Sequence, residues 1–121
     1  MKKNILPFLV ILILLFSFHL FGQTWSPTKR LTWGGYSYTP AIAIDSNNHI
    51  HVFWEDFAFG NAEIFYKKST DGGANWSVER ITWNSGVSQT PAITVDSGNG
   101  IHVIWDDDSP GYFDIFYKNR K

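Results

Sequence analysis

Short apolar runs rich in β-branched and aromatic residues, separated by turn-forming residues, make up most of the chain after its first twenty or so positions. In the first half these runs are 40–45 (PAIAID), 49–56 (HIHVFWED), 62–69 (AEIFYKKS) and 78–83 (VERITW). Their shortness and their Ile, Val, Phe, Trp and Thr content predict β-strands, and nothing in this part of the chain has helical periodicity. The runs therefore predict an all-β protein.

The same pattern occurs twice. Residues 35–67 align without a gap on residues 86–118, at a spacing of 51, and 19 of the 33 positions are identical. The match extends outward, because WSPTKRLTW (25–33) parallels WSVERITW (76–83) with one residue fewer in the second copy. Repeats of this length are typical of stacked supersecondary units, none of which can bury its apolar faces alone.

Each repeat has the strand content of one β-propeller blade, which is a four-stranded antiparallel sheet. In the run 49–56, Ile50, Val52 and Trp54 alternate with His51 and Phe53, so both faces are mostly apolar or aromatic. A sheet with one solvated face would alternate apolar and charged residues more cleanly. The sequence therefore predicts about two blades: repeat 1 at about 25–75 and repeat 2 at about 76–121. The second blade is incomplete, with three strands.

The N-terminus has the pattern of a secretory signal peptide. Met1–Lys3 is basic, and an apolar run follows from Ile5 to Phe21. We predict a signal peptide at 1–22, with residues 23–121 exported to the periplasm, the cell surface or the medium. Leu20 stands where a small residue is expected before the cleavage site, so an uncleaved membrane anchor is the alternative.

Composition narrows the classes of partner. There is no Cys, so no disulfide framework or lipid-modified cysteine holds an exported chain of this size. Without Lys2 and Lys3, eight basic residues stand against eleven acidic ones, and the net charge of the mature part is near −3. No basic face favours nucleic acid.

The segment STDGGANW (69–76) links the third and fourth expected strands of the first blade. Asp71 can accept backbone N–H bonds, glycines can adopt positive φ, and Trp76 can bury its ring between strands. The fixed positions Ser69, Asp71, Gly73 and Trp76 resemble the Asp box, or BNR repeat, of sialidase-like β-propellers, with Asn75 where that family often has Thr. In the family this box is structural and lies away from the catalytic pocket.

The resemblance also implies which residues a catalytic member of the sialidase-like family would need. Sialidase-type enzymes hold the substrate carboxylate with three arginines and use a Tyr nucleophile and an Asp acid/base, an exception among glycosidases. This sequence has Arg30, Arg80 and Arg120, none in the family's Phe/Tyr-Arg-Ile-Pro motif. We assign no catalytic residue here. The enzyme alternative is that the chain is part of an exo-sialidase-type hydrolase whose catalytic residues lie outside it.

Acidic residues follow the second strand of each repeat. They are Glu55, Asp56, Asp106, Asp107 and Asp108. One interpretation is that they are solvated loop ends or bind backbone amides; the alternatives are Ca²⁺ coordination and hydrogen bonds to sugar hydroxyls. His51 and His102 are repeat-equivalent, which predicts the same role in each blade and not a shared metal site.

Propellers usually bind ligands on the face formed by the loops before the first strand and after the second. Here those loops place aromatic residues beside the acidic ones: Trp33, Tyr36, Tyr38, Trp83 and Tyr112. Rings next to carboxylates suit the apolar face and the hydroxyls of a sugar, so this set is our candidate glycan site. The alternative for Trp33 and Trp83, which repeat, is packing between blades.

Two blades cannot close a ring, since propellers have about four to eight. Either the missing blades belong to the same, longer polypeptide, or copies assemble, with the 25–33 strand of one completing the last blade of the next. Three copies would then give a homotrimer with six blades, similar to small two-blade bacterial lectins. Both alternatives fit an exported, non-catalytic module that binds carbohydrate or protein or has a structural role.

Overall fold

The structure is a computed structural model that describes residues 22–121. The expected signal peptide lies outside the described residues, apart from Gly22. The chain divides into two units, one ending at Leu31 and the other running from Thr32 to Lys121. Among the residues described, no helix is long and apolar enough to cross a membrane.

Seven strands in two antiparallel sheets make up the second unit. The first sheet has the order β1-β2-β3-β4 and the second has the order β5-β6-β7. The strands are β1 (Ser37–Ile44), β2 (Ile50–Asp56), β3 (Glu63–Ser69), β4 (Ser77–Arg80), β5 (Ser88–Val95), β6 (Ile101–Asp107) and β7 (Asp114–Arg120). The prediction of an all-β chain is confirmed, with four strands in the first sheet and three in the second.

One side chain organises the tight turn between the first two strands of each sheet. Asp45 Oδ1 accepts the backbone N–H groups of Asn47 and His49, both at 2.9 Å. In the second sheet Asp96 Oδ1 accepts those of Gly98 (2.9 Å) and Gly100 (2.8 Å). A carboxylate that binds backbone two and four residues ahead closes the turn and fixes the register of the hairpin.

The fourth strand is shorter than the run 78–83 predicted. Ile81 N–H still donates to Ile64 O at 2.7 Å, but the N–H of Ile64 donates to the Thr82 hydroxyl at 2.9 Å instead of a carbonyl. The backbone is thereby free to leave the ladder after Arg80 and pass to the second sheet, where Ser88 N–H donates to Ala62 O at 2.9 Å.

The strand expected at 25–33 is absent, and that expectation is wrong for the chain by itself. Residues 22–33 have no regular secondary structure. The equivalent segment, β4, is a strand because it pairs with β3 of its own sheet. A strand needs a neighbouring strand to pair with its backbone groups. Within the part of the chain that the structure describes, residues 22–33 join neither sheet.

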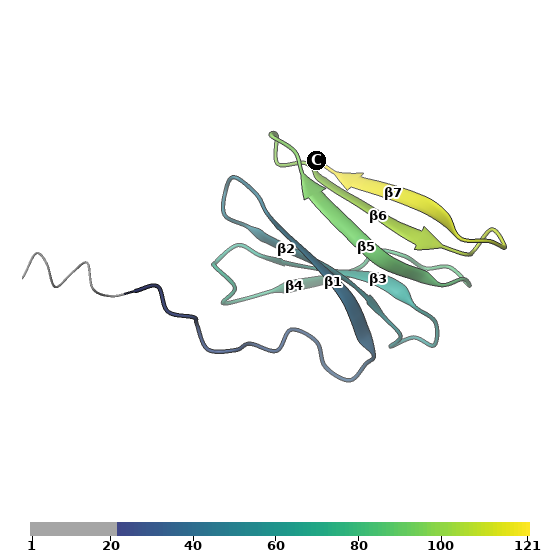
Figure 1. The fold of residues 1–121 in the computed structure, drawn as a ribbon, viewed down its shortest axis with the longest axis horizontal. Helices are drawn as coiled ribbons and strands as arrows, with labels where there is room; N and C mark the ends of the chain where they lie inside the picture. The colour runs from purple at the N-terminus through teal and green to yellow at the C-terminus, as the bar shows by residue number, and fades with distance from the viewer. Residues whose placement is uncertain (1–21) are drawn as a thin grey trace, which may run out of the picture. The chain divides into compact units, whose positions relative to one another are not determined.

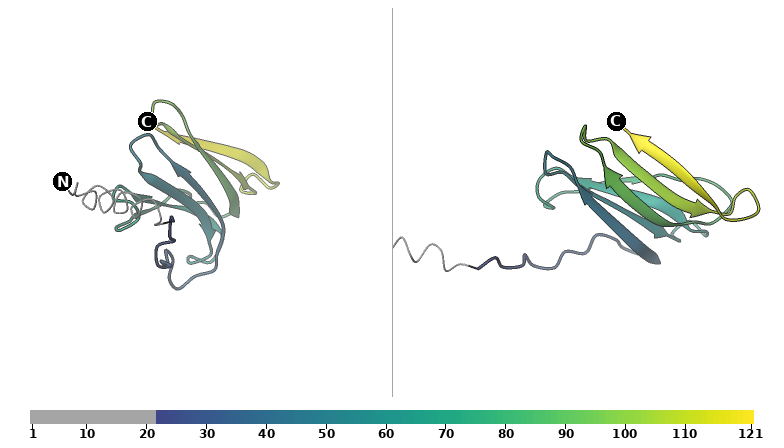
Figure 2. Two further views of the ribbon diagram at one scale, coloured as in Figure 1. Left: turned by 60° about the vertical axis from the view of Figure 1, so that its left-hand side comes forward. Right: turned by 45° about the horizontal axis from the view of Figure 1, so that its top comes forward.

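The two sheets lie face to face, with β1 and β5 close together and β4 and β7 at the outer edges (Figures 1 and 2). Their facing side chains form the hydrophobic core of the second unit. The buried members are Phe53, Ile64, Tyr66 and Ile81 from the first sheet and its exit, and Ile101, Val103 and Trp105 from the second. Ile93 and Phe116 pack against this cluster from β5 and β7.

Equivalent residues of the two repeats differ in burial. Ile64 and Tyr66 are 0% and 3% exposed, whereas Ile115 and Tyr117, 51 positions later, are 71% and 54% exposed. The face of the first sheet that carries Ile64 is covered by the second sheet. The same face of the second sheet is uncovered in the single chain.

This difference predicts unequal effects of the same substitution. Ile64→Ala should lower the free energy of unfolding by about 2–5 kcal/mol, because it removes a fully buried side chain and leaves a cavity. Ile115→Ala should change it by no more than about 0.5 kcal/mol, since its side chain is exposed. Urea unfolding in dilute solution measures both; equal losses would show that the core is not where the structure has it.

Candidate ligand-binding surface

The loops expected to carry a ligand site lie at one end of each sheet. They precede β1 and β5 and follow β2 and β6, and the register pairs Ser37 with Asp56 and Ser88 with Asp107 at these strand ends. The candidate acidic residues therefore stand at the base of the loops that carry the candidate aromatic residues.

Asp56 and Asp107 hold these loops in the same way in both repeats. Asp56 accepts hydrogen bonds from Ser37 Oγ (2.7 Å), Trp54 Nε1 (3.0 Å) and the N–H of Ala58 (2.9 Å). The equivalent bonds to Asp107 come from Ser88 Oγ at 2.6 Å, Trp105 Nε1 at 3.2 Å and Ser109 N–H at 2.9 Å. Both carboxylates are buried. Their position and bonding indicate a structural role.

The electrostatics of Asp107 agree with that role. Burial by itself would raise its pKa, but hydrogen bonds from Ser109, Ser88 and Asn84 outweigh burial and hold the pKa well below its ordinary value. Asp107 is therefore an ionised acceptor with several donors, which is the usual way for a protein to keep a buried carboxylate charged.

Glu55 connects the two sheets. Its Oε2 accepts the Thr39 hydroxyl at 2.8 Å and the backbone N–H of Thr90, in the other sheet, at 2.7 Å. Thr39 and Thr90 have φ of 48° and 50°, a conformation that β-branched residues rarely adopt. Each sits at a break in strand register, between Tyr38 and Ala41 in β1 and at the same place in β5. In β5 this irregularity coincides with the Thr90 N–H bond to Glu55.

The remaining two acidic candidates also have partners. Asp106 accepts Gln89 Nε2 at 2.9 Å, and Asp108 accepts the N–H of Val87 at 2.6 Å. The interpretation that these carboxylates bind backbone amides is confirmed for Glu55, Asp56, Asp107 and Asp108. No group of three or more potential metal ligands is found within residues 22–121.

Two of the aromatic candidates do come together. Tyr36 and Tyr38 line an open cleft of about 380 Å³ with Phe57 and Gly60. The ring of Tyr38 meets that of Phe57 edge to face, with centroids 6.1 Å apart, and Tyr36, Tyr38 and Phe57 are exposed. The floor of this loop is fixed by Asp56, which holds Ser37 and Ala58 on either side of it.

The other aromatic candidates lie apart from this cleft. Trp33 and Trp83 are exposed, and each has a cation over its ring: Lys67 Nζ lies 5.1 Å from the Trp33 ring and the Arg80 guanidinium 5.7 Å from that of Trp83. Tyr112 is exposed in the loop between β6 and β7. Both tryptophans are exposed in the single chain, and Trp83 also lines a cleft between the two sheets.

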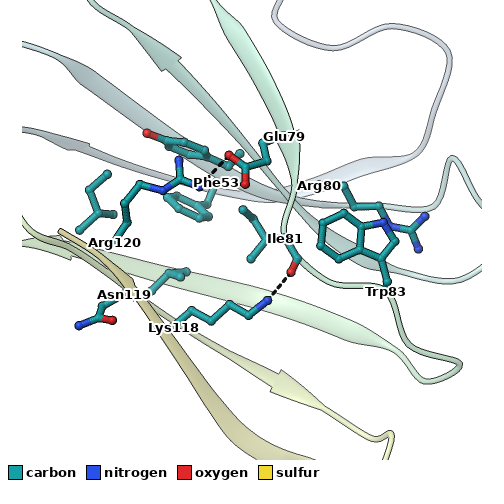
Figure 3. Close-up of a pocket in the computed structure, with 11 residues that line it drawn as sticks. Phe53, Glu79, Arg80, Ile81, Trp83, Lys118, Asn119 and Arg120 are labelled. Carbon is teal, nitrogen blue, oxygen red and sulfur yellow. Dashed lines mark hydrogen bonds and ion pairs between the residues drawn. The ribbon is translucent and has the colours of Figure 1, made fainter.

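A second cleft, of about 200 Å³, lies between the outer parts of the two sheets (Figure 3). Its basic groups are already bound within the chain. Arg120 makes two 2.8 Å bonds to Glu79, Lys118 donates to Ile81 O at 2.7 Å, and Arg80 Nε donates to Thr82 O at 2.7 Å. Arg80 also pairs with buried Glu63 at 2.9 Å. Arg80 and Arg120 thus serve different carboxylates and do not form an arginine cluster for a substrate.

The STDGGANW segment forms the folded turn that was predicted. Asp71 accepts Asn75 N–H and Ser69 Oγ at 2.8 and 2.9 Å, and Gly72 and Gly73 have φ of 69° and 90°. The half-buried Trp76 donates from its ring N–H to Gly73 O at 3.0 Å. Hydrogen bonds from Asn75 and Ser69 lower the pKa of Asp71 from 3.8 to about 2.

His51 and His102 have equivalent hydrogen-bond partners, as their repeat equivalence predicted. Nδ1 of His51 contacts Tyr66 Oη at 2.8 Å and Nε2 contacts Asp45 Oδ2 at 3.1 Å. His102 makes the equivalent contacts with Tyr117 and Asp96, both at 2.8 Å. Each trio links a hairpin turn to the third strand of its sheet, so these histidines have a structural partner on both ring nitrogens.

Sequence reasoning placed Asp45 and Asp96 in turns, but it did not assign the hydrogen bonds that organise the site. Asp45 and Asp96 build the turns, Ser37 and Ser88 bond the buried carboxylates, and Thr39 and Thr90 occupy the irregular positions. A signal was present, because all six are identical between repeats, but identity alone does not separate a hydrogen-bonding role from a packing role.

Acid should unfold the protein through its bound carboxylates. Burial raises the pKa of Asp45, but hydrogen bonds from His49, His51 and Asn47 outweigh it and lower the pKa from 3.8 to about 2; Asp71 is lowered to the same value. A carboxylate with a folded pKa below its unfolded pKa contributes stability above about pH 4 that is lost as the pH falls toward 2.

We therefore expect the urea midpoint to stay level from about pH 7 to 5 and to fall steeply between about pH 4 and 2. Asp71→Asn should be less stable at neutral pH and show a shallower fall. A fall of the same steepness in that variant would contradict the assignment of Asp71 as a folded-state anion.

The comparisons with known proteins assign this chain to no family. Neither the protein-family models nor the curated proteins contain a match to it. The resemblance to sialidase-like propellers stays a prediction from the residues that carry it. The function therefore has to be inferred from the seven strands, the two clefts and the carboxylate network.

Proposed function

We propose that the chain is an exported, non-catalytic binding module of propeller-type blades, and that it binds carbohydrate at the cleft of Tyr36, Tyr38 and Phe57. The observation that carries the proposal is this group of exposed rings around an open cleft of about 380 Å³. Exposed rings on a rigid base offer an apolar platform for the C–H face of a sugar, and the tyrosine hydroxyls offer hydrogen bonds.

The bonding of the acidic residues supports binding over catalysis. A glycosidase needs two carboxyl groups positioned around the scissile bond, one to give a proton and one to act as base or nucleophile. Asp56 and Asp107 instead accept three or more hydrogen bonds each, and Glu55 bridges the sheets. Groups held in this way suit the support of a binding surface.

The rigidity of the cleft supports it as well. Phe57 N–H donates to Tyr36 O at 3.2 Å, and Gly60 N–H donates to Phe57 O at 3.1 Å. The backbone that carries two of the rings is therefore bonded across the cleft. A preformed platform loses little conformational entropy when a ligand binds, which favours affinity.

A glycan array probed with the full chain tests this function. We expect binding to a subset of glycans, confirmed by calorimetry with the best free oligosaccharide. Tyr36→Ala should weaken binding by about tenfold, which corresponds to about 1.4 kcal/mol, within the range for an aromatic contact and its buried area. Tyr36 is exposed, so the substitution should not affect folding.

Val78→Ala is the matched control, since Val78 is also an exposed apolar residue but lies on β4, outside the cleft. It should leave the affinity unchanged. Absence of binding to any glycan, or equal losses in the two variants, would overturn carbohydrate binding at this cleft.

A further inference from the structure

The contact between the two sheets has two different faces. The first sheet contributes Phe53, Ile64 and Tyr66. The second sheet contributes Val103, Trp105 and neighbouring residues, which lie on the face opposite to its own equivalents of Phe53, Ile64 and Tyr66. At the repeat spacing of 51, Phe53, Ile64 and Tyr66 correspond to Ile104, Ile115 and Tyr117. These three are 44%, 71% and 54% exposed. The second sheet therefore repeats the contact face of the first, uncovered.

The complementary face is also repeated, and its β1 residues are exposed, although Val52 and Trp54 of β2 are buried. Ile93 of β5 packs against the core from the second sheet, and its equivalent in β1 is Ile42. Ile42 and Ile44 are both exposed on the far side of the first sheet. The second unit thus has two outer faces with exposed apolar residues. Each carries the residues of one half of the contact that the two sheets already make.

We propose that a second copy of this chain docks head to tail, with the far face of its first sheet covering the free face of the second sheet here. The proposal is independent of what the cleft at Tyr36 binds. A second copy is the occupant because the two free faces match each other position by position through the repeat.

The polar contacts between the sheets have equivalents ready at the proposed contact. Between the two sheets, Ser88 N–H donates to Ala62 O. The equivalent donor and acceptor at the proposed contact are the N–H of Ser37 of the second copy and the carbonyl of Phe113. Likewise, Thr90 N–H donates to the carboxylate of Glu55. The equivalent donor and acceptor are the N–H of Thr39 of the second copy and the carboxylate of Asp106. Thr39 has the same unusual φ as Thr90, so its backbone has the geometry that the bond to Glu55 uses in the existing contact.

The buried contacts of Glu63 have equivalents too. Glu63 accepts bonds from Arg80 and Thr82, at the point where the chain leaves the first sheet for the second. The equivalent acceptor is Asp114, which is exposed. The residues that correspond to Arg80 and Thr82 are Arg30 and Thr32, and head-to-tail docking directs those of the second copy to Asp114.

The outer edge of the second sheet completes the correspondence. β7 has β6 on one side, whereas β3 has β4 on its outer side, in a register that pairs Phe65 with Arg80. In docking, residues 26–30 of the second copy add to β7 as its fourth strand, with Arg30 opposite Phe116. Addition of a strand to a free edge satisfies backbone groups that are otherwise left to solvent.

A head-to-tail contact is heterologous, so it closes into a ring or extends as a filament. Three copies would bring six sheets together, which is within the range of about four to eight blades at which propellers close. We infer the closed ring, because the same contact then covers every free face.

The absence of Cys from the chain allows the contact to be tested by disulfide trapping. Ser46 N–H and Oγ bond Asn99 Oδ1 between the two sheets, at 3.0 and 2.8 Å. The equivalent pair at the proposed contact is Ser97 of one copy and Asn48 of the next. The full chain carrying both Ser97→Cys and Asn48→Cys, oxidised in mild detergent, should form intermolecular disulfides and run on a non-reducing gel up to three chain masses.

The matched control carries Ser46→Cys and Asn99→Cys, which should form a disulfide within one chain and run at one chain mass. Both pairs place one Cys at an Asn of positive φ, 63° for Asn48 and 64° for Asn99, so the strain is the same. Adding Ile115→Asp to the test pair should abolish trapping, because a charge at that exposed position is harmless in one chain and costly in the contact.

A control pair that closes within the chain, together with a test pair that stays at one chain mass, overturns the proposal. So does trapping that Ile115→Asp leaves unchanged, since that result would mean random collision of exposed thiols. Neither result bears on glycan binding, which is measured at the Tyr36 cleft.

Discussion

The structure depends on one constraint: each sheet of this chain is apolar on both faces, so each face needs cover. The first sheet meets that need on one side by packing Phe53, Ile64 and Tyr66 against Val103 and Trp105 of the second. Apolar burial supplies the main favourable free energy, at about 25 cal/mol per Å² removed from water. One such contact leaves apolar residues of the outer faces exposed, namely Ile42 and Ile44 on the first sheet and Ile104, Ile115 and Tyr117 on the second.

Polar groups set how the sheets approach each other, and they do so with repeated parts. Glu55 reaches across to the backbone of Thr90, and Glu63 receives the side chains that guide the chain out of β4. Buried carboxylates of this kind are costly unless their donors are in place. They therefore specify one relative placement of the sheets, whereas the apolar contact alone would tolerate sliding.

Much of the fold could be predicted from the sequence, because the signals were local. The four strand runs and the turn at Asp71 follow from residue type and spacing, and both are present. The end of β4 at Arg80 could not be predicted, since it depends on a hydroxyl of Thr82 that replaces a carbonyl in the ladder. The strand at 25–33 was predicted by analogy to β4. A strand forms only where a neighbouring strand can pair with its backbone, and the sequence of the segment alone does not show whether such a partner is present.

The site was less predictable for a related reason. Residue type identified Tyr36 and Tyr38 as surface rings and Asp56 as a polar neighbour, but not that Asp56 lies beneath them as a buried anchor. A carboxylate and a ring that are adjacent in sequence suggest one site, whereas alternation along a strand sends them to different surroundings. The acidic residues fix the loops and the rings face solvent, so the chemistry open to a ligand at this end of the sheet is that of the rings.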